Sequence, residues 1–486
     1  MRDAYLGTAL MRIDRLALGA HTARRRHKLI MTRPALRSIP AVEKVLQALG
    51  ETGLPRPVVL ARVRAALGAL RKLPQIPKPD AVLDDLRRSL AALRHTRIQP
   101  VINATGILIH TNLGRAPLAA AAKDALLACA GYSNLEFDLA AGERGPRAAY
   151  LENNLALLCG AEAATVVNNC AAALVLILRH FAQSPRDEVI ISRGELVQIG
   201  GGFRIPDILE ASGARLREVG TTNKTTVADY ARALGPKTAL LLKVHRSNFF
   251  MGGFVESPST EDLAALAKKK RVAFVEDLGS GAVIATERRS DAEHEPTPSE
   301  VLKGGVDLVC CSGDKLFGGP QAGLIAGRAR FISALKREPF FRALRCDKLV
   351  LCALQATVDL YLAGAGESSI PAWQMLTIDR ETLRQRADLL CTALQGLPVT
   401  IRIGKSRGQV GGGTLPRSAL ESVALELSGG TLSPAALSAR LRHGTPPVIG
   451  FVSAGVVKLD LRTVFPEQDV LLAQRLREAC ENIPST

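Results

Sequence analysis

The strongest constraint on the fold is an alternation of short apolar segments and amphipathic segments between residues 99 and 375. The apolar segments predicted as strands are 163–168, 188–192, 238–244, 272–277, 306–311 and 322–326. Strands that alternate with helices are typical of a mostly parallel sheet covered by helices. We therefore predict an α/β fold with a mostly parallel central sheet for this large domain.

Regions with other patterns flank this domain. Residues 37–98 favour a small helical domain, with helices at 41–49, 56–72 and 80–93 separated by prolines. Residues 376–486 favour an α+β domain, with helices at 378–394, 433–443 and 467–482 and strands at 400–403, 422–427, 448–452 and 456–461. Residues 1–36 form a basic extension: a disordered arm, an import signal, or a stretch upstream of a true start at Met31.

Positive charge is concentrated at the front of the chain. Residues 1–100 hold 20 Lys and Arg against 7 Asp and Glu, a net +13 of the total +17. Such asymmetry indicates a polyanionic partner. Tyr5 is the only aromatic residue there, which favours backbone and shape recognition of folded RNA over base stacking. The alternative is a solvated helical face without a partner.

Composition excludes several other classes of protein. No segment approaches 18 uninterrupted apolar residues, so no membrane span is predicted. The nine cysteines show no Cys-x-x-Cys spacing, so neither a metal site nor a redox pair is indicated. Several cysteines lie in apolar runs, which is typical of a protein in the reducing cytoplasm.

One lysine occupies an unusual position. Lys315 lies in a glycine-rich turn directly after the predicted strand 306–311. A long charged side chain beside an apolar run is poorly suited to folding alone, because lysine is rarely buried without a partner. A Schiff base with pyridoxal phosphate is a chemistry that uses such a lysine. The competing interpretation is an ordinary surface lysine.

Two further features favour the cofactor. Asp277 ends another predicted strand, where it is suited to hold the pyridine nitrogen of the cofactor across the carboxyl ends of the sheet. Asn168 and Asn169 precede an alanine-rich helix that begins near Cys170, and a helix N-terminus is a ready phosphate site. Ser312 adds a hydroxyl. Each feature alone has a structural explanation as a helix cap, but together they predict a pyridoxal phosphate site.

The chain also resembles a known family over about nine-tenths of its length, from near Arg37 to the C-terminus. The motifs that carry the resemblance are Ile102–Pro117, Tyr132–Asp138, Ser192–Val197, Val219–Lys224, Leu242–Asn248, Asp277–Gly281, Ser312–Gly323 and Arg342–Leu349. In these motifs the chain is similar to bacterial selenocysteine synthase, the L-seryl-tRNA(Sec) selenium transferase family. The resemblance implies a fold-type-I pyridoxal-phosphate-dependent transferase.

The resemblance also implies roles for individual residues. Lys315 matches the Schiff-base lysine, Asp314 the acid beside it, and Asp277 the partner of the pyridine nitrogen. The arginines that surround the selenium donor, selenophosphate, match Arg115, Arg342 and Arg345. Guanidinium groups suit such a compact polyanion. Without the family, Arg342 and Arg345 are read equally well as one face of a surface helix.

The implied reaction converts L-seryl-tRNA(Sec) to L-selenocysteinyl-tRNA(Sec) through a cofactor aldimine, β-elimination to an aminoacrylyl ester and addition of selenium. The resemblance further implies tRNA binding by residues 37–98 and a homo-oligomer, a ring of dimers and most simply a homodecamer, with active sites at subunit interfaces. Two alternatives stay open. One is a pyridoxal phosphate lyase acting on a free small amino acid or amino sugar, and the other is an RNA-binding protein with a vestigial cofactor site.

The chain departs from the family pattern at four positions. Gln198 stands in place of a glutamate, Cys170 of an asparagine, Arg246 of a threonine and Phe451 of an arginine. None of these departures removes a catalytic group. Gln198 and Cys170 are expected near the cofactor, so they bear on how it is packed.

Overall fold

The computed structural model describes residues 38–481 except 74, 289–291 and 431. The predictions for residues 1–36 therefore lie outside the described residues. Contacts divide the chain into two compact units, Met1–Gln99 and Pro100–Thr486, and each is considered by itself. The further division of the second unit near residue 375 stays a prediction.

The first unit is a small helical module with a core of its own. Its helices are α3 (Val42–Leu49), α4 (Arg56–Leu70) and α5 (Pro79–His95), close to the predicted ranges. Prolines in the first turn fix where α4 and α5 begin, because proline suits the first helical positions. The buried side chains come from all three helices: Val45, Val59, Val63, Leu67, Leu70, Val82, Leu86 and Leu90.

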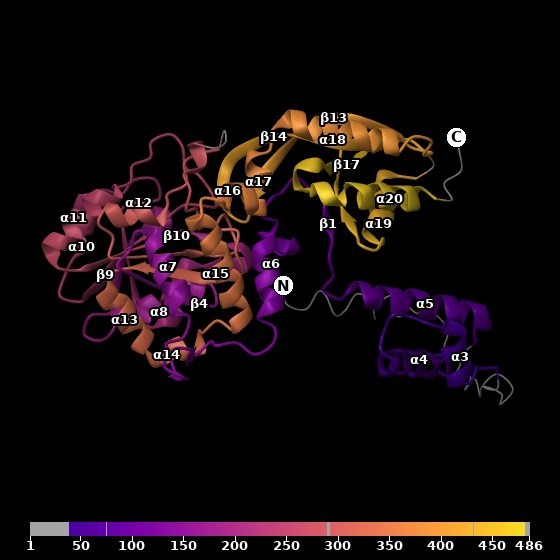
Figure 1. Cartoon of the computed structure of the whole chain (residues 1–486), viewed down its shortest axis with the longest axis horizontal. Helices are drawn as coiled ribbons and strands as arrows, with labels where there is room; N and C mark the ends of the chain where they lie inside the picture. Colours follow the sequence, from indigo (N-terminus) through magenta and orange to yellow (C-terminus); the bar gives the residue numbers. More distant parts are fainter. Residues whose placement is uncertain (1–37, 74, 289–291, 431, 482–486) are drawn as a thin grey trace, which may run out of the picture. The chain divides into compact units, whose positions relative to one another are not determined.

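A seven-stranded sheet forms the centre of the second unit in the described residues (Figure 1). Its order is β4 (Ala163–Val167), β12 (Gly323–Gly327), β11 (Leu308–Ser312), β10 (Ala273–Gly279), β9 (Thr238–Val244), β5 (Glu188–Ser192) and β8 (Arg215–Val219). The strands are parallel except β12, which runs antiparallel to both of its neighbours. The predicted α/β fold with a mostly parallel sheet is confirmed.

Helices cover both faces of this sheet, which is why its inner strands are mostly apolar, with few charged residues such as Glu276 and Asp277 in β10. One face packs against α7 (Ala149–Cys159), α11 (Thr260–Lys270), α12 (Pro298–Lys303) and α15 (Lys348–Leu362). The other face packs against α8 (Cys170–Phe181), α9 (Ile205–Ser212) and α13 (Ala329–Arg337). The two faces of β11 illustrate the alternation: Cys310 belongs to one core and Cys311 to the other.

The carboxyl ends of the parallel strands bring the predicted site residues to one edge of the sheet. Asp277 lies near the end of β10, and Lys315 lies in the turn that follows β11. Asn168 and Asn169 follow β4 directly. This edge is where ligands bind in open α/β sheets.

The C-terminal part of the second unit is α+β. Its four-stranded antiparallel sheet, in the described residues, has the order β13 (Thr400–Gly411), β14 (Thr414–Ser428), β17 (Val456–Asp460) and β16 (Phe451–Ser453). Its helices are α18 (Arg380–Ala393), α19 (Pro434–Arg442) and α20 (Asp469–Cys480).

Two strand predictions in this part were wrong in extent. β13 and β14 are much longer than 400–403 and 422–427, because glycine and polar residues hide the pattern. Gly404 lies close to a side chain of the paired strand, since a Cβ there would lie 2.3 Å from Glu426 Oε1. The predicted strand 448–452 is interrupted at Gly450: β15 (Val448–Ile449) pairs with β1 (Ile102–Asn103), and β16 pairs with β17.

Shorter elements connect these parts. They are α6 (Ala120–Ala128), β2 (Phe137–Asp138), β3 (Glu143–Arg144), β6 (Gln198–Ile199), β7 (Phe203–Arg204), α10 (Val227–Ala233), α14 (Pro339–Ala343), α16 (Gly366–Ser369) and α17 (Pro371–Thr377). The edge strand β8 is absent from the predicted strands because three of its five residues are exposed and polar. No helix in the described part of the chain has the length and apolarity needed to cross a bilayer.

Candidate active site

Lys315 is almost fully buried, with 7% of its surface exposed. The turn that carries it is fixed by backbone hydrogen bonds: Leu316 N–H donates to Ser280 O at 3.0 Å, and Gly318 N–H donates to Lys315 O at 2.9 Å. Within the described residues Lys315 forms no ion pair closer than 4.0 Å, although its charge acts on Asp277. The fold thus holds an amine at the sheet edge without a contacting counter-ion, as a reactive lysine requires.

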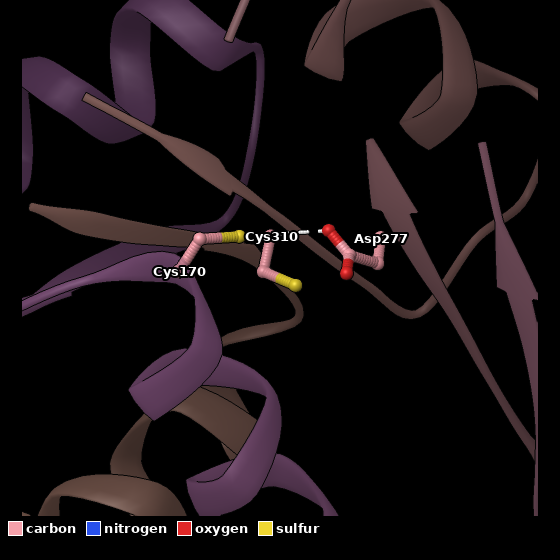
Figure 2. A group of neighbouring side chains, drawn as sticks. All are labelled: Cys170, Asp277 and Cys310. Carbon is pink, nitrogen blue, oxygen red and sulfur yellow. Dashed lines mark hydrogen bonds between the residues drawn. The ribbon is translucent and has the colours of Figure 1, made fainter. Parts of the chain in front are cut away.

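Asp277 is a buried acid on which the charge of Lys315 acts. Its surface is 6% exposed, and the Cys170 thiol donates to its Oδ1 at 3.5 Å (Figure 2). Burial raises the pKa of the Asp277 carboxyl, while the Lys315 ammonium and the Cys170 and Cys310 thiols oppose that rise. A cationic partner at this carboxylate would favour its charged form.

Asp314, next to Lys315 in the chain, is paired with Arg115. The Nη1 atom of Arg115 lies 3.1 Å from Oδ1 and 2.9 Å from Oδ2 of Asp314. The loop that carries Arg115 is also joined to this turn by the backbone, since Ala116 N–H donates to Asp314 O at 3.1 Å. Arg115 itself has a left-handed backbone, with φ at 65°. The two residues are distant in sequence, but the fold places them together.

The N-terminus of α8 lies at the same edge. The Asn169 side chain caps the helix by accepting from Ala172 N–H at 2.8 Å. Asn168 is exposed, Asn169 and Cys170 are half-buried, and Ser312 is buried. The chain packs closely here: a Cβ on Gly323 would lie 2.2 Å from Asn169 O, and one on Gly281 would lie 2.2 Å from Ser312 O. Glycine at these two positions lets the strand ends approach.

The other two predicted arginines belong to a different group of charges. Arg345 Nη1 lies 3.8 Å from Glu136 Oε1, a carboxylate that also pairs with Arg144 and Arg147. The hydrogen bond from Arg147, together with the charges of Arg144, Arg147 and Arg345, lowers the pKa of Glu136. Arg342 is exposed on α14. In one chain, therefore, Arg115 contacts the lysine turn and Arg345 contacts Glu136.

Comparison with known proteins supports the resemblance. A family model described as L-seryl-tRNA selenium transferase matches residues 101–465. The L-seryl-tRNA(Sec) selenium transferase of Aquifex aeolicus is 43% identical over 447 residues, covering 91% of this chain and 98% of the relative. That of Hyphomonas neptunium is 44% identical over 445 residues, covering 88% and 95%.

The chain belongs to the L-seryl-tRNA selenium transferase family.

The fold is confirmed independently by a solved structure. D-glucosaminate-6-phosphate ammonia-lyase is similar with a TM-score of 0.55 and 23% identity, covering 79% of this chain and 97% of that one. At that identity the likeness supports the fold alone. The fold-type-I class that the resemblance implied is thus the fold observed for this family member.

Some polar groups at the edge were missed by sequence reasoning. Ser280 Oγ is fully buried and has no hydrogen-bond partner among the described residues, although its backbone holds the lysine turn. His245 follows β9 and donates its backbone N–H to Asp277 O at 2.8 Å. His110 Nδ1 is likewise buried without a partner in the described part of the chain. For Ser280 and His245, their position directly after a strand was the available signal.

The departures from the family pattern fall in different surroundings. Cys170 contacts the site acid, as expected of a residue near the cofactor. Gln198 is exposed in the β6–β7 hairpin and accepts from Arg204 Nε at 3.1 Å. Arg246 donates to Ser257 Oγ at 3.3 Å, and Phe451 pairs with Lys458 between β16 and β17. Of these positions, Cys170 is the one with a direct bond to Asp277.

Proposed function

We propose that this chain converts L-seryl-tRNA(Sec) to L-selenocysteinyl-tRNA(Sec), with selenophosphate as the donor and pyridoxal phosphate as the cofactor. Membership of the family supports the reaction class. The single observation that carries the site assignment is the burial of Lys315 and Asp277 together at the carboxyl edge of the sheet. They belong to the ends of two adjacent strands, β10 and β11, so an amine and an acid lie where one ligand can contact both.

The residues present fit pyridoxal phosphate. A buried carboxylate suits a protonated ring nitrogen, and the open first turn of α8 suits a phosphate. Ser280 leaves a buried hydroxyl without a partner in the described residues, which a bound ligand can satisfy. Asn168, Asn169, Cys170 and Ser312 are the residues proposed to hold the phosphate and ring edge.

Pyridoxal phosphate, when bound, supplies an electron sink for negative charge at the substrate Cα. Lys315 is proposed to carry the cofactor and then, as a free amine, to take the Cα proton of the seryl group. Asp277 would hold the protonated ring nitrogen of the bound cofactor, and its burial would strengthen that interaction. Asp314 orients Arg115 through their ion pair.

The three predicted arginines are proposed to hold selenophosphate. Arg115 contacts Asp314 beside Lys315, while in the same chain Arg345 contacts Glu136 and Arg342 is exposed on α14. Because Arg115 and Arg345 have different contacts within one chain, we propose that a second subunit completes the site. Arginines of one copy would then lie at the Lys315 site of another. Charge-assisted, forked hydrogen bonds suit a compact polyanion.

Residues 37–98 are proposed to bind the tRNA. On or just after α4, Arg62, Arg64, Arg71 and Lys72 are exposed and form no ion pair with any described residue. Three other basic residues of this unit are paired locally: Arg56 with Glu43, Arg87 with Asp84 and Arg88 with Asp85. The unpaired cations are therefore available for phosphates.

The chain is proposed to act as a homo-oligomer, a ring of dimers and most simply a homodecamer. Large apolar side chains are exposed over one stretch of sequence around α6 and α7: Leu127, Tyr132, Phe137, Leu139, Tyr150 and Leu157. Large apolar side chains exposed in a single chain are candidates for burial between subunits. Light scattering of the purified protein tests the assembly, and a monomer would contradict it. The cytoplasmic location stays a prediction.

A visible-absorption titration tests the proposed reaction. Purified protein supplied with pyridoxal phosphate is titrated with seryl-tRNA(Sec) and, in parallel, with free L-serine. We expect the cofactor band to change with the charged tRNA and not with serine. A band that responds to serine alone would instead support the small-substrate lyase, and the absence of any cofactor band would leave the RNA-binding protein.

A further inference from the structure

Cys170, Asp277 and Cys310 form a cluster whose chemistry goes beyond holding a cofactor. Their side chains come from α8, β10 and β11 and converge on one point (Figure 2). One potential ligand atom from each residue lies within 4.8 Å of the other two. Cys310 stands directly opposite Asp277 in the β10–β11 register, so the backbone fixes this arrangement. No other cluster of this kind is present in the described residues.

The donor set is that of a thiophilic divalent cation. Zinc binds cysteine sulfur at about 2.3 Å and carboxylate oxygen at about 2.0–2.2 Å, so ligands of one tetrahedral site lie roughly 3.5–4 Å apart. The cluster spacing needs little adjustment to reach that range. Two thiolates select zinc, cadmium or cobalt over magnesium and calcium, which prefer oxygen ligands.

We propose that the cofactor-free protein binds one thiophilic divalent cation, represented by zinc, through Cys170, Asp277 and Cys310, and that this cation and pyridoxal phosphate exclude each other. The exclusion rests on the proposed function, because it assumes that Asp277 serves the cofactor. A carboxylate bound to a dication is neutralised and no longer stabilises a protonated ring nitrogen.

The partial exposure of one ligand and the small number of protein ligands both suit an ion that can exchange. Asp277 and Cys310 are buried, whereas Cys170 is half-buried and is followed by the exposed Ala171 in the first turn of α8. Three protein ligands leave a fourth position for water, as in zinc sites that are not purely structural. The Lys315 ammonium, which acts on Asp277, opposes the cation. Removing that charge in a Lys315→Ala variant should therefore tighten zinc binding.

A simpler explanation is that both thiols only pack beside the acid, with Cys170 donating a hydrogen bond to it. The test is zinc titration of reduced, oxygen-free, cofactor-free protein against a chromogenic chelator, with cobalt absorption to report thiolate ligation. Wild type is compared with Cys170→Ala and Cys310→Ala. Cys311→Ala is the matched control, since it removes a neighbouring buried thiol that faces the other core. Cys352→Ala controls for a second thiol pair, formed with Cys129.

Wild type and both controls should bind one tight equivalent of zinc and show the same cobalt–thiolate band. Cys170→Ala and Cys310→Ala should weaken that equivalent by about 10-fold or more, because even the loss of an outer-shell partner has an effect of this size. Equal zinc affinity in all five proteins would overturn the proposal. Thermal unfolding checks each variant, and the half-buried Cys170 decides the question if Cys310→Ala does not fold.

The exclusion has its own readout. Zinc-loaded protein should gain the visible cofactor band only after a chelator is added, while zinc-free protein gains it directly. Equal cofactor loading of both forms would overturn the exclusion and leave the zinc site standing. A zinc-free protein that never binds the cofactor would overturn the proposed function and the exclusion, whereas the zinc titration would still judge the site alone.

Discussion

Arg115 Nη1 contacts both carboxylate oxygens of Asp314, the residue that precedes the buried lysine. The Asp314 side chain is 8% exposed and that of Arg115 is 33% exposed, so the pair is shielded on the acid side. An anionic donor that approaches Arg115 must share it with this carboxylate. The pair thereby links Arg115, which we propose binds the selenium donor, to the residue next to Lys315.

Arg115→Ala should destabilise the protein by about 1–3 kcal/mol, because it leaves a buried carboxylate without its charged partner. The loss should be smaller than for a fully buried pair, since Arg115 is partly exposed. Adding Asp314→Asn should restore most of the free energy of unfolding but not the KM for selenophosphate. A double-mutant cycle measures both, and recovery of KM in the double variant would contradict the role of Arg115 in donor binding.

Lys315→Ala should reduce selenium transfer by at least about 10²–10⁴-fold, the effect of removing a proton-transferring group. Binding of seryl-tRNA(Sec) should be retained, because the proposed tRNA contacts lie in the first unit. Single-turnover assays and a filter-binding titration measure the two quantities. Transfer at the wild-type rate would exclude Lys315 as the cofactor lysine.

Alanine at four unpaired basic positions, Arg62, Arg64, Arg71 and Lys72, should weaken tRNA binding and flatten its salt dependence. Each lost phosphate contact lowers the log–log salt slope by roughly 0.7–0.9. Arg56→Ala combined with Arg88→Ala is the matched control, because those side chains are already paired with acids in the same unit. An unchanged slope in the fourfold variant would indicate that this surface is only solvated.

Gly323→Ala should destabilise the protein by about 1–3 kcal/mol through overpacking. A Cβ at that position would lie 2.2 Å from Asn169 O and 2.5 Å from Asn169 C, which are backbone atoms that cannot rotate away. The start of α8 must then shift, so cofactor affinity should fall as well. Gly235→Ala, where nothing lies within 4 Å of the added atom, should leave both quantities unchanged. Chemical denaturation and cofactor titration of the two variants measure the difference.

Glu195 should make stability depend on pH. Its burial raises the pKa of the carboxyl to about 7, against an ordinary value of 4.5, while Val244 N–H donates to Oε2 at 3.0 Å. Between those two pH values the folded protein holds a proton that the unfolded chain releases. Its contribution is therefore full below pH 4.5 and is lost as pH rises through 7, by up to about 3 kcal/mol.

Glu195→Gln removes this titration and retains an acceptor for Val244. The free energy of unfolding of wild type minus that of the variant should therefore fall between pH 4.5 and 7 and level off above. Denaturation at a series of pH values measures it, and a difference that stays constant across the range would contradict the assignment.

Sequence reasoning located residues that stand at strand ends, because strand and turn patterns are local. Lys315, Asp277 and Asn169 were found in this way. It could not place Arg115 against Asp314 or Cys170 against Asp277, since those contacts depend on the order of strands and on where α8 begins. The absence of a Cys-x-x-Cys spacing likewise gave no sign that Cys170 and Cys310 converge.

The extent of the strands was also partly hidden. Gly404 and Gly408 in β13 appear as breakers in the sequence, but a Cβ there would collide with Glu426 and Arg462 side chains. Side chains of neighbouring segments pass close to the strand at these glycines, and that closeness is visible only in three dimensions. The polar edge strand β8 was also not predicted. It forms by pairing with β5, while its own sequence lacks the apolar residues that indicate a strand.

β11 is hydrogen-bonded to a strand on each side and buried on both faces. Backbone amides in such a strand exchange with solvent through openings that approach global unfolding. The turn that carries Lys315 begins where this strand ends, so the first residues of the turn stay in place during a catalytic cycle. Any rearrangement that admits a bulky aminoacyl end must therefore occur in the more exposed segments around it, such as those bearing Arg342 and Arg345.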